Sequence, residues 1–180
     1  MHAPSEHTVN GEHYPLEIHI VHVDAATGVP AAVIGIFFEE SEDPDFENEF
    51  LNDLLPELTN GPSKTGKTVG TLNLGTFLKQ VDFREVYNYD GSFTTPPCTE
   101  GINWLVVKKP LKISKEQLEV FVDHWAGNLA FAGGFGNNRL PQPLKGRTVK
   151  LSKFDAKFDE NQSKGLLTLC SNCQTAAAGK

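Results

Sequence analysis

The sequence predicts a mainly β domain with short helices at its periphery. Several segments alternate or concentrate apolar residues over lengths typical of strands, and Gly, Pro, Asn and Asp residues separate them. Only two segments carry apolar side chains at helical spacing. With 180 residues, of which 39% are hydrophobic, the chain is long enough for one domain with a substantial core.

Five segments are expected to be strands: LEIHIVHV (16–23), AAVIGIFF (31–38), VGTLNL (69–74), REVYNYDGSF (84–93) and INWLVVKK (102–109). Alternation in the first segment places one set of side chains on one face, namely Glu17, His19 and Val21. The opposite face then carries Leu16, Ile18, Ile20 and His22. Such a strand either presents a polar face to water or holds a metal ligand beside its carboxylate neighbour.

Two helices are expected between these strands. The segment FENEFLNDLL (46–55) lines up apolar residues on one side and ends before Pro56. The segment SKEQLEVFVDHW (114–125) begins with a capping box formed by Ser114 and Gln117. We therefore predict one domain over residues 1–150. Residues 151–180, which are polar and then Ala-rich, are expected to be a poorly ordered extension.

The charge pattern argues against several classes of partner. The net charge is −7 and the pI is near 5.3, and no basic patch is present, which disfavours nucleic acid and anionic membranes. The apolar run at 31–38 is too short to span a bilayer. The first ten residues lack the basic and apolar regions of a signal peptide, so none is expected in this chain.

Histidines gather at the start of the chain. Five of the six lie within the first 22 residues: His2, His7, His13, His19 and His22. Histidines clustered around a strand favour a metal site, although a surface histidine is commoner than a ligand. Cys170 and Cys173 form a C-x-x-C without the second pair that a zinc ribbon needs, and their state is left open.

Four motifs in order, HAPSEHTVNG, LEIHIVHVD, YDGSFTTPPCTEGINW and RLPQPLKGR, resemble the alpha-class carbonic anhydrases. The resemblance runs from residue 1 to about residue 148. It implies a large, mostly antiparallel twisted sheet that here lacks its N-terminal strands. It also implies a Zn²⁺ cofactor held by three histidines, with His2 as the second ligand and His19 as the third. The first ligand would fall immediately before Met1.

The same resemblance implies a reaction, the reversible hydration of carbon dioxide to bicarbonate by attack of a zinc-bound hydroxide. Thr94 and Glu6 match the pair that aligns this hydroxide, and Glu17 matches the carboxylate that orients a ligand imidazole. The substrate pocket would be formed by Val21, Val33, Phe93, Thr95, Ile102 and Trp104, although by pattern alone most of them are ordinary core residues. His7 and His22 match structural histidines. The proton-shuttle residue of the family lies before Met1.

Cys98 follows the TTPP motif, where secreted members of the family carry a cysteine bonded to another near their N-terminus. The resemblance therefore implies a parent protein that is secreted or extracytoplasmic. Two hypotheses remain open at this point. The chain is a zinc carbonic anhydrase, or the larger part of one, with carbon dioxide or bicarbonate as its small-molecule partner. Alternatively, it is a non-catalytic fragment related to that family, which acts as a binding module or has no activity.

Overall fold

The computed structural model describes residues 1–58, 72–129 and 132–153. In chain order, the first half contains β1 (Thr8–Val9), β2 (Glu12–His13), β3 (Leu16–Val23), β4 (Pro30–Glu40), α1 (Glu49–Asn52), α2 (Leu55–Leu58) and α3 (Leu74–Lys79). The second half contains β5 (Glu85–Ser92), β6 (Glu100–Ile113), α4 (Lys115–Trp125), the 3₁₀ turn η1 (Ala132–Gly134) and β7 (Lys150–Lys153). No helix in these ranges is long and apolar enough to cross a membrane.

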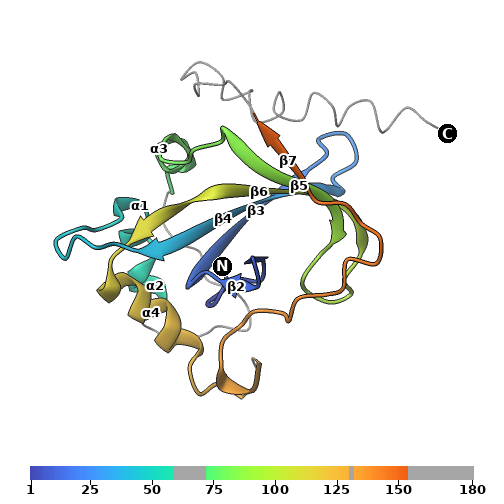
Figure 1. Cartoon of the computed structure of the whole chain (residues 1–180). Coiled ribbons are helices and arrows are strands. Elements are labelled where there is room, and N and C mark those ends of the chain that lie inside the picture. Colours follow the sequence, from blue (N-terminus) through green and yellow to red (C-terminus); the bar gives the residue numbers. More distant parts are fainter. Residues whose placement is uncertain (59–71, 130–131, 154–180) are drawn as a thin grey trace.

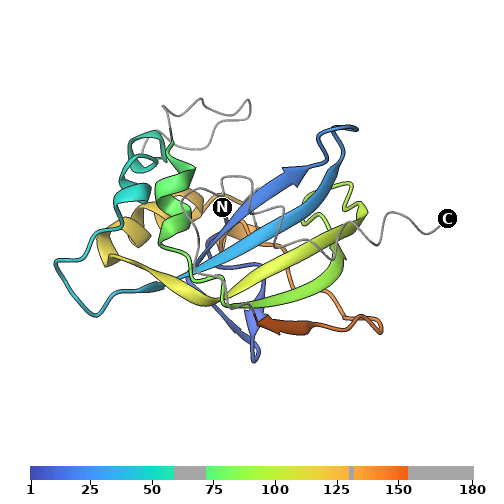
Figure 2. The ribbon, with the colours of Figure 1, turned by 90° about the horizontal axis from the view of Figure 1, so that it is seen from above.

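A twisted five-stranded sheet in the order β3-β4-β6-β5-β7 organises the molecule (Figure 1). All neighbouring strands are antiparallel except β4 and β6, which run parallel. Helices α1, α2 and α4 gather at one end of the sheet, as Figures 1 and 2 show. The expected mainly β, mostly antiparallel architecture with short peripheral helices is therefore confirmed.

The two faces of the sheet carry separate apolar clusters. The larger cluster joins β3, β4 and β6 to the helices, and its fully buried members include Ile36, Phe38, Leu51, Phe77 and Ile113. The smaller cluster lies on the opposite face and contains Val33, Phe37, Ile102, Trp104 and Val106. The register of β3 on β4 pairs Glu17 with Phe37 and His19 with Gly35. Glu17 and His19 therefore lie on the face of the smaller cluster, as their alternation predicts.

The start of the chain runs along the outer edge of β3. The His2 N–H donates to the Glu17 carbonyl at 2.8 Å, and the Glu17 N–H donates to the His2 carbonyl at 2.9 Å. Between these two residues the β1–β2 hairpin turns at Asn10 and Gly11, whose φ angles are 55° and 86°. An Asn-Gly pair with two positive φ angles is the preferred residue pair for a tight hairpin turn. The hairpin thus returns the chain so that His2 comes beside β3.

Several predictions about individual elements are wrong. The helix expected at 46–55 is divided into α1 and α2, and Pro56 lies inside α2. Proline is tolerated there because the N–H groups of a first turn have no intrahelical partner. For the strand expected at 69–74, residues 69–71 lie outside the described residues. Leu74 begins α3 instead, because the Asn73 side chain accepts a hydrogen bond from the Thr76 N–H and caps the helix.

Helix α4 was predicted correctly from its local sequence, whereas strand β7 was not predicted. Helix α4 has the expected capping box, in which Ser114 and Gln117 each bond the other's backbone. Strand β7 pairs with β5 through Lys153, so the sheet continues past the domain boundary that we predicted at residue 150. Its partner strand supplies the hydrogen bonds that a short polar segment needs to be extended. The remainder of the expected extension, residues 154–180 with Cys170 and Cys173, lies outside the described residues.

Candidate metal centre

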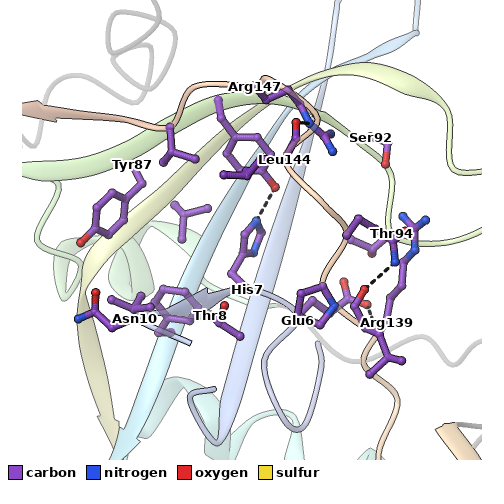
Figure 3. A pocket seen from close by; sticks show the side chains of 18 residues that line it. Glu6, His7, Thr8, Asn10, Tyr87, Ser92, Thr94, Arg139, Leu144 and Arg147 are labelled. Atoms are coloured by element: carbon purple, nitrogen blue, oxygen red, sulfur yellow. Dashed lines mark hydrogen bonds between the residues drawn. The ribbon is translucent and has the colours of Figure 1, made fainter. Parts of the chain in front are cut away.

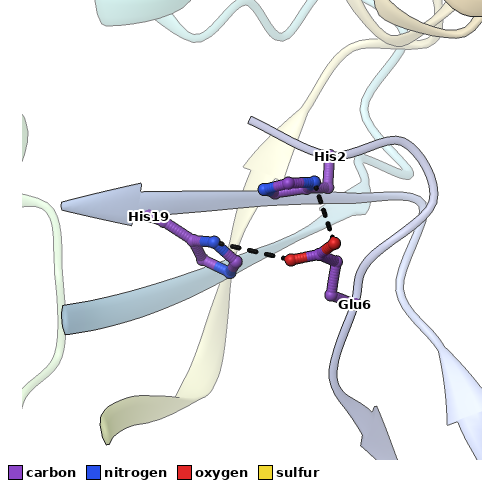
Figure 4. Close-up of side chains that lie close together, drawn as sticks. All are labelled: His2, Glu6 and His19. Carbon is purple, nitrogen blue, oxygen red and sulfur yellow. Dashed lines mark ion pairs between the residues drawn. The ribbon is translucent and has the colours of Figure 1, made fainter. Parts of the chain in front are cut away.

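Two imidazoles meet beside a buried carboxylate at the edge of β3 (Figure 4). His2 comes from the start of the chain and His19 from β3, and their ring centroids lie 4.6 Å apart. Glu6 lies between them, with Oε1 3.3 Å from His2 Nδ1 and Oε2 3.8 Å from His19 Nδ1. All three side chains are at most 12% exposed. Their ligand atoms are close enough to hold one metal ion.

Each of the two rings has one nitrogen beside a protein acceptor. His2 Nδ1 lies 3.3 Å from the Asn137 carbonyl, and His19 Nε2 lies 2.9 Å from Glu17 Oε1, outside good hydrogen-bond geometry. Within the described ranges no hydrogen bond engages His2 Nε2 or His19 Nδ1. Histidines that bind metals usually have this arrangement, in which an acceptor fixes the tautomer and leaves the other nitrogen for the metal.

The protonation state of His2 suits a ligand. Burial lowers its pKa to about 3, and the positive charge of the nearby chain terminus and of His19 acts in the same direction. His2 is therefore neutral at neutral pH. Only a neutral imidazole has a lone pair to give to a metal, so no proton has to be displaced from this residue before binding.

Glu17 is a fully buried charge surrounded by donors. Its Oε2 accepts hydrogen bonds from the backbone N–H groups of Glu6 at 2.8 Å and His7 at 3.0 Å. Its Oε1 lies 2.6 Å from His7 Nδ1. Burial by itself would raise the pKa of Glu17, but the adjacent imidazoles of His19 and His7 outweigh burial and hold it well below its usual range. The carboxylate is therefore ionised at neutral pH.

Glu6 is bonded on one side only. Its Oε1 accepts the Arg139 N–H at 2.7 Å, whereas its buried Oε2 has no hydrogen-bond partner. Thr94 lines the same cavity as Glu6 (Figure 3). No hydrogen bond joins these two residues among the described ones, so their predicted pairing stays a prediction. Glu6 Oε2 is the acceptor available for it.

The cavity that Thr94 and Glu6 share is about 340 Å³ and lies between β1, β5 and residues 139–149. None of the six predicted substrate-pocket residues lines it. Val33, Ile102 and Trp104 are buried in the smaller apolar cluster, against which the half-buried Phe93 packs. Val21 and Thr95 are exposed. This cavity is therefore distinct from the apolar pocket that the resemblance implies. The role of the six predicted residues in binding substrate stays a prediction.

The three residues expected to be structural have different surroundings. His7 lies between Glu17 and Tyr89, with its Nε2 2.7 Å from the Tyr89 hydroxyl. His22 is half-buried, and its Nδ1 lies 3.0 Å from the Ile20 carbonyl. Cys98 is a half-buried free thiol with a φ of 58°. Its disulfide and the localisation inferred from it stay predictions.

Sequence reasoning missed three residues that hold this site together: Tyr89, Asn137 and Arg139. Tyr89 lies opposite Trp104 in the β5–β6 register, so strand alternation could have placed it on the face of His19. Asn137 and Arg139 come from a loop without periodicity, and they reach His2 and Glu6 through contacts that no local pattern reports.

Comparison with known proteins agrees with this architecture. Residues 1–153 match the model of the eukaryotic-type carbonic anhydrase family. The chain belongs to this carbonic anhydrase family. Among relatives, it is 39% identical over 148 residues to a carbonic anhydrase of Klebsiella pneumoniae, covering 82% of this chain and 54% of the relative. To alpha carbonic anhydrase 4 of Arabidopsis thaliana it is 42% identical over 152 residues, covering 82% and 50%.

Solved structures match with similar coverage. The alpha carbonic anhydrase from Thermovibrio ammonificans, solved with the inhibitor sulfanilamide, is 40% identical with a TM-score of 0.66 and covers 82% of this chain and 58% of that one. Dioscorin in complex with ascorbate is 30% identical with a TM-score of 0.67, covering 86% and 61%. The chain thus spans about half the length of the curated relatives that it matches.

Proposed function

We propose that this chain supplies most of a zinc site for the reversible hydration of carbon dioxide to bicarbonate. One observation carries the proposal. The imidazoles of His2 and His19 lie together and are at most 12% exposed, each with one nitrogen beside a protein acceptor and the other without a hydrogen bond among the described residues. Three protein ligands and one open position are typical of catalytic zinc. The resemblance assigns the remaining ligand, the first in chain order, to the residue before Met1.

The donor set fits zinc, because imidazole nitrogens are among its preferred ligands. Bound zinc supplies a water whose pKa is near 7, a value for which carbonic anhydrase is itself the reference. His2 and His19 would hold the ion. Glu17 would keep the His19 ring oriented, and the apolar cluster around Val33 and Trp104 would exclude bulk water.

Thr94 and Glu6 would orient the attacking oxygen. The buried, unpartnered Glu6 Oε2 is an acceptor for the Thr94 hydroxyl, which would leave the threonine oxygen free to accept a hydrogen bond from the nucleophile. Holding a reacting group in one orientation removes an entropic part of the barrier. Arg139 fixes the other oxygen of Glu6 and so limits its rotation.

A second candidate is a non-catalytic domain. The observation that favours it is the count of histidine ligands, because the described residues bring only His2 and His19 to the site without competing bonds. Relatives of this kind of sequence include one named carbonic anhydrase-related protein from Homo sapiens, 33% identical over 166 residues. In this alternative the chain binds zinc weakly and leaves carbon dioxide unchanged.

A single added residue separates the two candidates. Two versions of the chain would carry either histidine or alanine immediately before Met1. Because alternate residues of an extended segment share a face, the added histidine would lie on the side of His2. We expect the histidine version to bind zinc much more tightly than the alanine version in a chelator competition. Equal zinc affinities would favour the non-catalytic domain.

Catalysis is then measured on the zinc-loaded histidine version by stopped-flow hydration of carbon dioxide. We expect Thr94→Ala to lower turnover by on the order of 10²-fold without releasing zinc, since it removes an orienting group and no ligand. Thr99→Ala, an exposed threonine of the same loop to which no role is assigned, is the matched control. Full zinc occupancy with no measurable hydration would also favour the non-catalytic domain.

A further inference from the structure

We propose that the cavity between β1, β5 and residues 139–149 binds a small aromatic carboxylate. The cavity measures about 340 Å³, which lies in the range of pockets that enclose small organic ligands. The proposed hydration uses the side chains of only two residues that line it, Thr94 and Glu6. The inference therefore goes beyond the proposed function, and the binding it describes needs no metal ion.

One side of the cavity is apolar and aromatic. Phe37 and Val106 are buried members of the smaller apolar cluster, and Tyr87 packs against that cluster. Leu144, which comes from the loop 139–149, also lines the cavity and is 54% exposed. Apolar surface of this kind gains free energy when an apolar group removes it from water, and aromatic rings favour another flat ring. This side therefore suits the hydrocarbon body of an aromatic ligand.

The other side of the cavity carries a cation without a partner. Figure 3 shows the side chain of Arg139 beside Thr94, on the side of the cavity away from Tyr87. Arg139 is half-buried, and its guanidinium makes no hydrogen bond or ion pair with any of the described residues. A partly desolvated charge without a partner is unfavourable, so an anion that enters the cavity would be stabilised there.

Arg147 is a second cation that lines the cavity, and its own loop holds it in place. Its Nε donates to the Leu144 carbonyl at 3.0 Å, and its Nη2 donates to the Pro143 carbonyl at 2.9 Å. Its Nη1 lies 3.9 Å from Oε2 of Glu100, whose side chain is 76% exposed. Such an exposed ion pair contributes little. The guanidinium is therefore oriented in advance and only weakly neutralised.

The charges around the cavity favour a single negative charge on the ligand. Residues 139–149 include Arg139, Lys145 and Arg147 and no Asp or Glu, although the whole chain has a net charge of −7. Glu6 is the one acid among the described residues that line the cavity. Because like charges repel, a bound carboxylate would lie toward the two guanidinium groups, whose planar forks match its two oxygens. A doubly charged phosphate would be repelled more strongly by Glu6.

The first test compares three ligands on the unmodified chain, with and without zinc. Calorimetric titration measures the dissociation constants of naphthalene-2-carboxylate, of its neutral carboxamide and of acetate. We expect the carboxylate to bind about 10-fold more tightly than the carboxamide, which lacks the charge-assisted hydrogen bonds. Acetate, which lacks the apolar body, should show no measurable binding. The same preference is expected whether or not zinc is present.

Three results of this comparison would overturn the proposal. They are no binding of naphthalene-2-carboxylate, equal affinities for the carboxylate and the carboxamide, and binding of the carboxylate only when zinc is present. The last result would mean that the ligand coordinates the metal instead of occupying the cavity. Failure of the chain to bind zinc would contradict the proposed function alone, because the titrations without zinc would still decide the role of the cavity.

Two substitutions that remove the same charge test the cationic side. Arg139→Gln removes the guanidinium from the cavity but keeps the backbone N–H that bonds Glu6. Lys145→Gln removes a charge from the same loop at a residue that does not line the cavity. We expect Arg139→Gln to weaken binding of the carboxylate about 10-fold without affecting the carboxamide, and Lys145→Gln to change it less than about 2-fold. Equal losses would mean that only the general charge of the loop attracts the ligand, which would overturn the proposal.

A second matched pair tests the apolar side. Leu144 lines the cavity, whereas Leu151 is 41% exposed and lies outside it. We expect Leu144→Ala to weaken binding of both naphthalene ligands about 3- to 10-fold, because part of the apolar contact is lost. Leu151→Ala should leave both dissociation constants unchanged. Equal losses in the two variants would place the ligand on the outer surface and would overturn the proposal.

Discussion

The two sides of the metal centre are held in different ways. On the His19 side, His7, which directly precedes β1, lies between Glu17 of β3 and Tyr89 of β5 at short hydrogen-bond distances. On the His2 side, the imidazole is held by a longer contact of 3.3 Å to the Asn137 carbonyl. The neighbouring Glu6 keeps one buried oxygen without a partner.

This difference shows what a regular sheet can and cannot supply. The His19 side depends on strand register, which aligns a whole row of side chains at once. The His2 side depends on contacts between the start of the chain and a loop. The Ala3 N–H donates to Asn137 Oδ1 at 3.0 Å, and Asn137 Nδ2 donates to the Met1 carbonyl at 2.9 Å. We expect the two sides to fail separately, and the following predictions test this.

The largest effect is expected on the His19 side from Glu17→Gln. This change removes a buried charge and turns one acceptor into a donor that faces other donors. Breaking a buried charged network typically costs about 3–5 kcal/mol, which urea unfolding of the metal-free chain would measure. Glu12→Gln, on an exposed strand, is the control and should be close to neutral. A loss for Glu17→Gln no larger than for the control would show that the His19 side is not preorganised.

The next effect is expected on the His2 side from Gly136→Ala. A Cβ on Gly136 would collide with the Ala3 carbonyl, and its φ of 140° is unfavourable for other residues. We expect destabilisation of about 2–3 kcal/mol and weaker zinc binding. Gly146→Ala, where φ is 84° and no atom is near, isolates the backbone cost of about 1–2 kcal/mol. Combined with Glu17→Gln, the two losses should add, and a departure from additivity would mean that the two sides are coupled.

The acid sensitivity of the metal-free chain should come first from the His2 side. Because the folded pKa of His2 is about 3 and its ordinary value is 6.5, only the unfolded state binds the proton between these values. Stability is therefore full above that range and falls as the pH drops, by up to about 1.4 kcal/mol per pH unit. Unfolding series at several pH values, compared with His2→Asn, measure this slope. Parallel slopes for both proteins would show that His2 titrates normally.

Glu17 extends the acid sensitivity to lower pH. Its depressed pKa contributes stability that is present above the ordinary value of 4.5 and is lost as the pH falls below it. The two sides of the centre should therefore lose stability in sequence on acidification, His2 first and Glu17 second. In Glu17→Gln the second loss should shrink while the first remains.

The smallest effect is expected from Asn137→Ala. It removes two hydrogen bonds to Met1 and Ala3 but keeps the backbone carbonyl that faces His2. A loss of about 1–2 kcal/mol is expected from thermal or urea unfolding, since each such bond contributes about 1 kcal/mol. Asn137→Asp keeps the acceptor for the Ala3 N–H, so its stability should lie between that of the unmodified chain and that of Asn137→Ala. If Asn137→Asp is as unstable as Asn137→Ala, the bond to Ala3 contributes nothing.

Sequence patterns over a few residues predicted correctly those elements that are determined by nearby residues. Alternation in β3 placed Glu17 and His19 on one face, and the capping box marked the start of α4. The same reasoning failed where tertiary contacts decide. Strand β7, for example, is ordered by pairing with β5. The start of α3 was missed for another reason, because its signal is local: the Asn73 side chain caps the helix by accepting from the Thr76 N–H.

The site follows the same division. His2, His19 and Glu17 were named from the motifs that carry the family resemblance, and the structure brings them together. Tyr89 and Asn137 lie far from them in sequence and reach the site only through the register of β5 and a loop contact. The missing hydrogen bond of Glu6 Oε2 could not be predicted from the sequence either, because it depends on where the distant residues Arg139 and Thr94 lie in the fold.

The parallel pairing of β4 with β6 also sets the order in which the molecule can be made. Val33 pairs with Trp104, so this contact waits until distant parts of the chain exist, whereas β3 and β4 form an adjacent hairpin. Pairings between distant segments close slowly because loop closure must come first. During synthesis His19 and Glu17 therefore emerge on a hairpin long before Tyr89 and Trp104 arrive to cover them. Until then, the buried charge of the finished centre lies in water, and the apolar side of the hairpin is open to other chains.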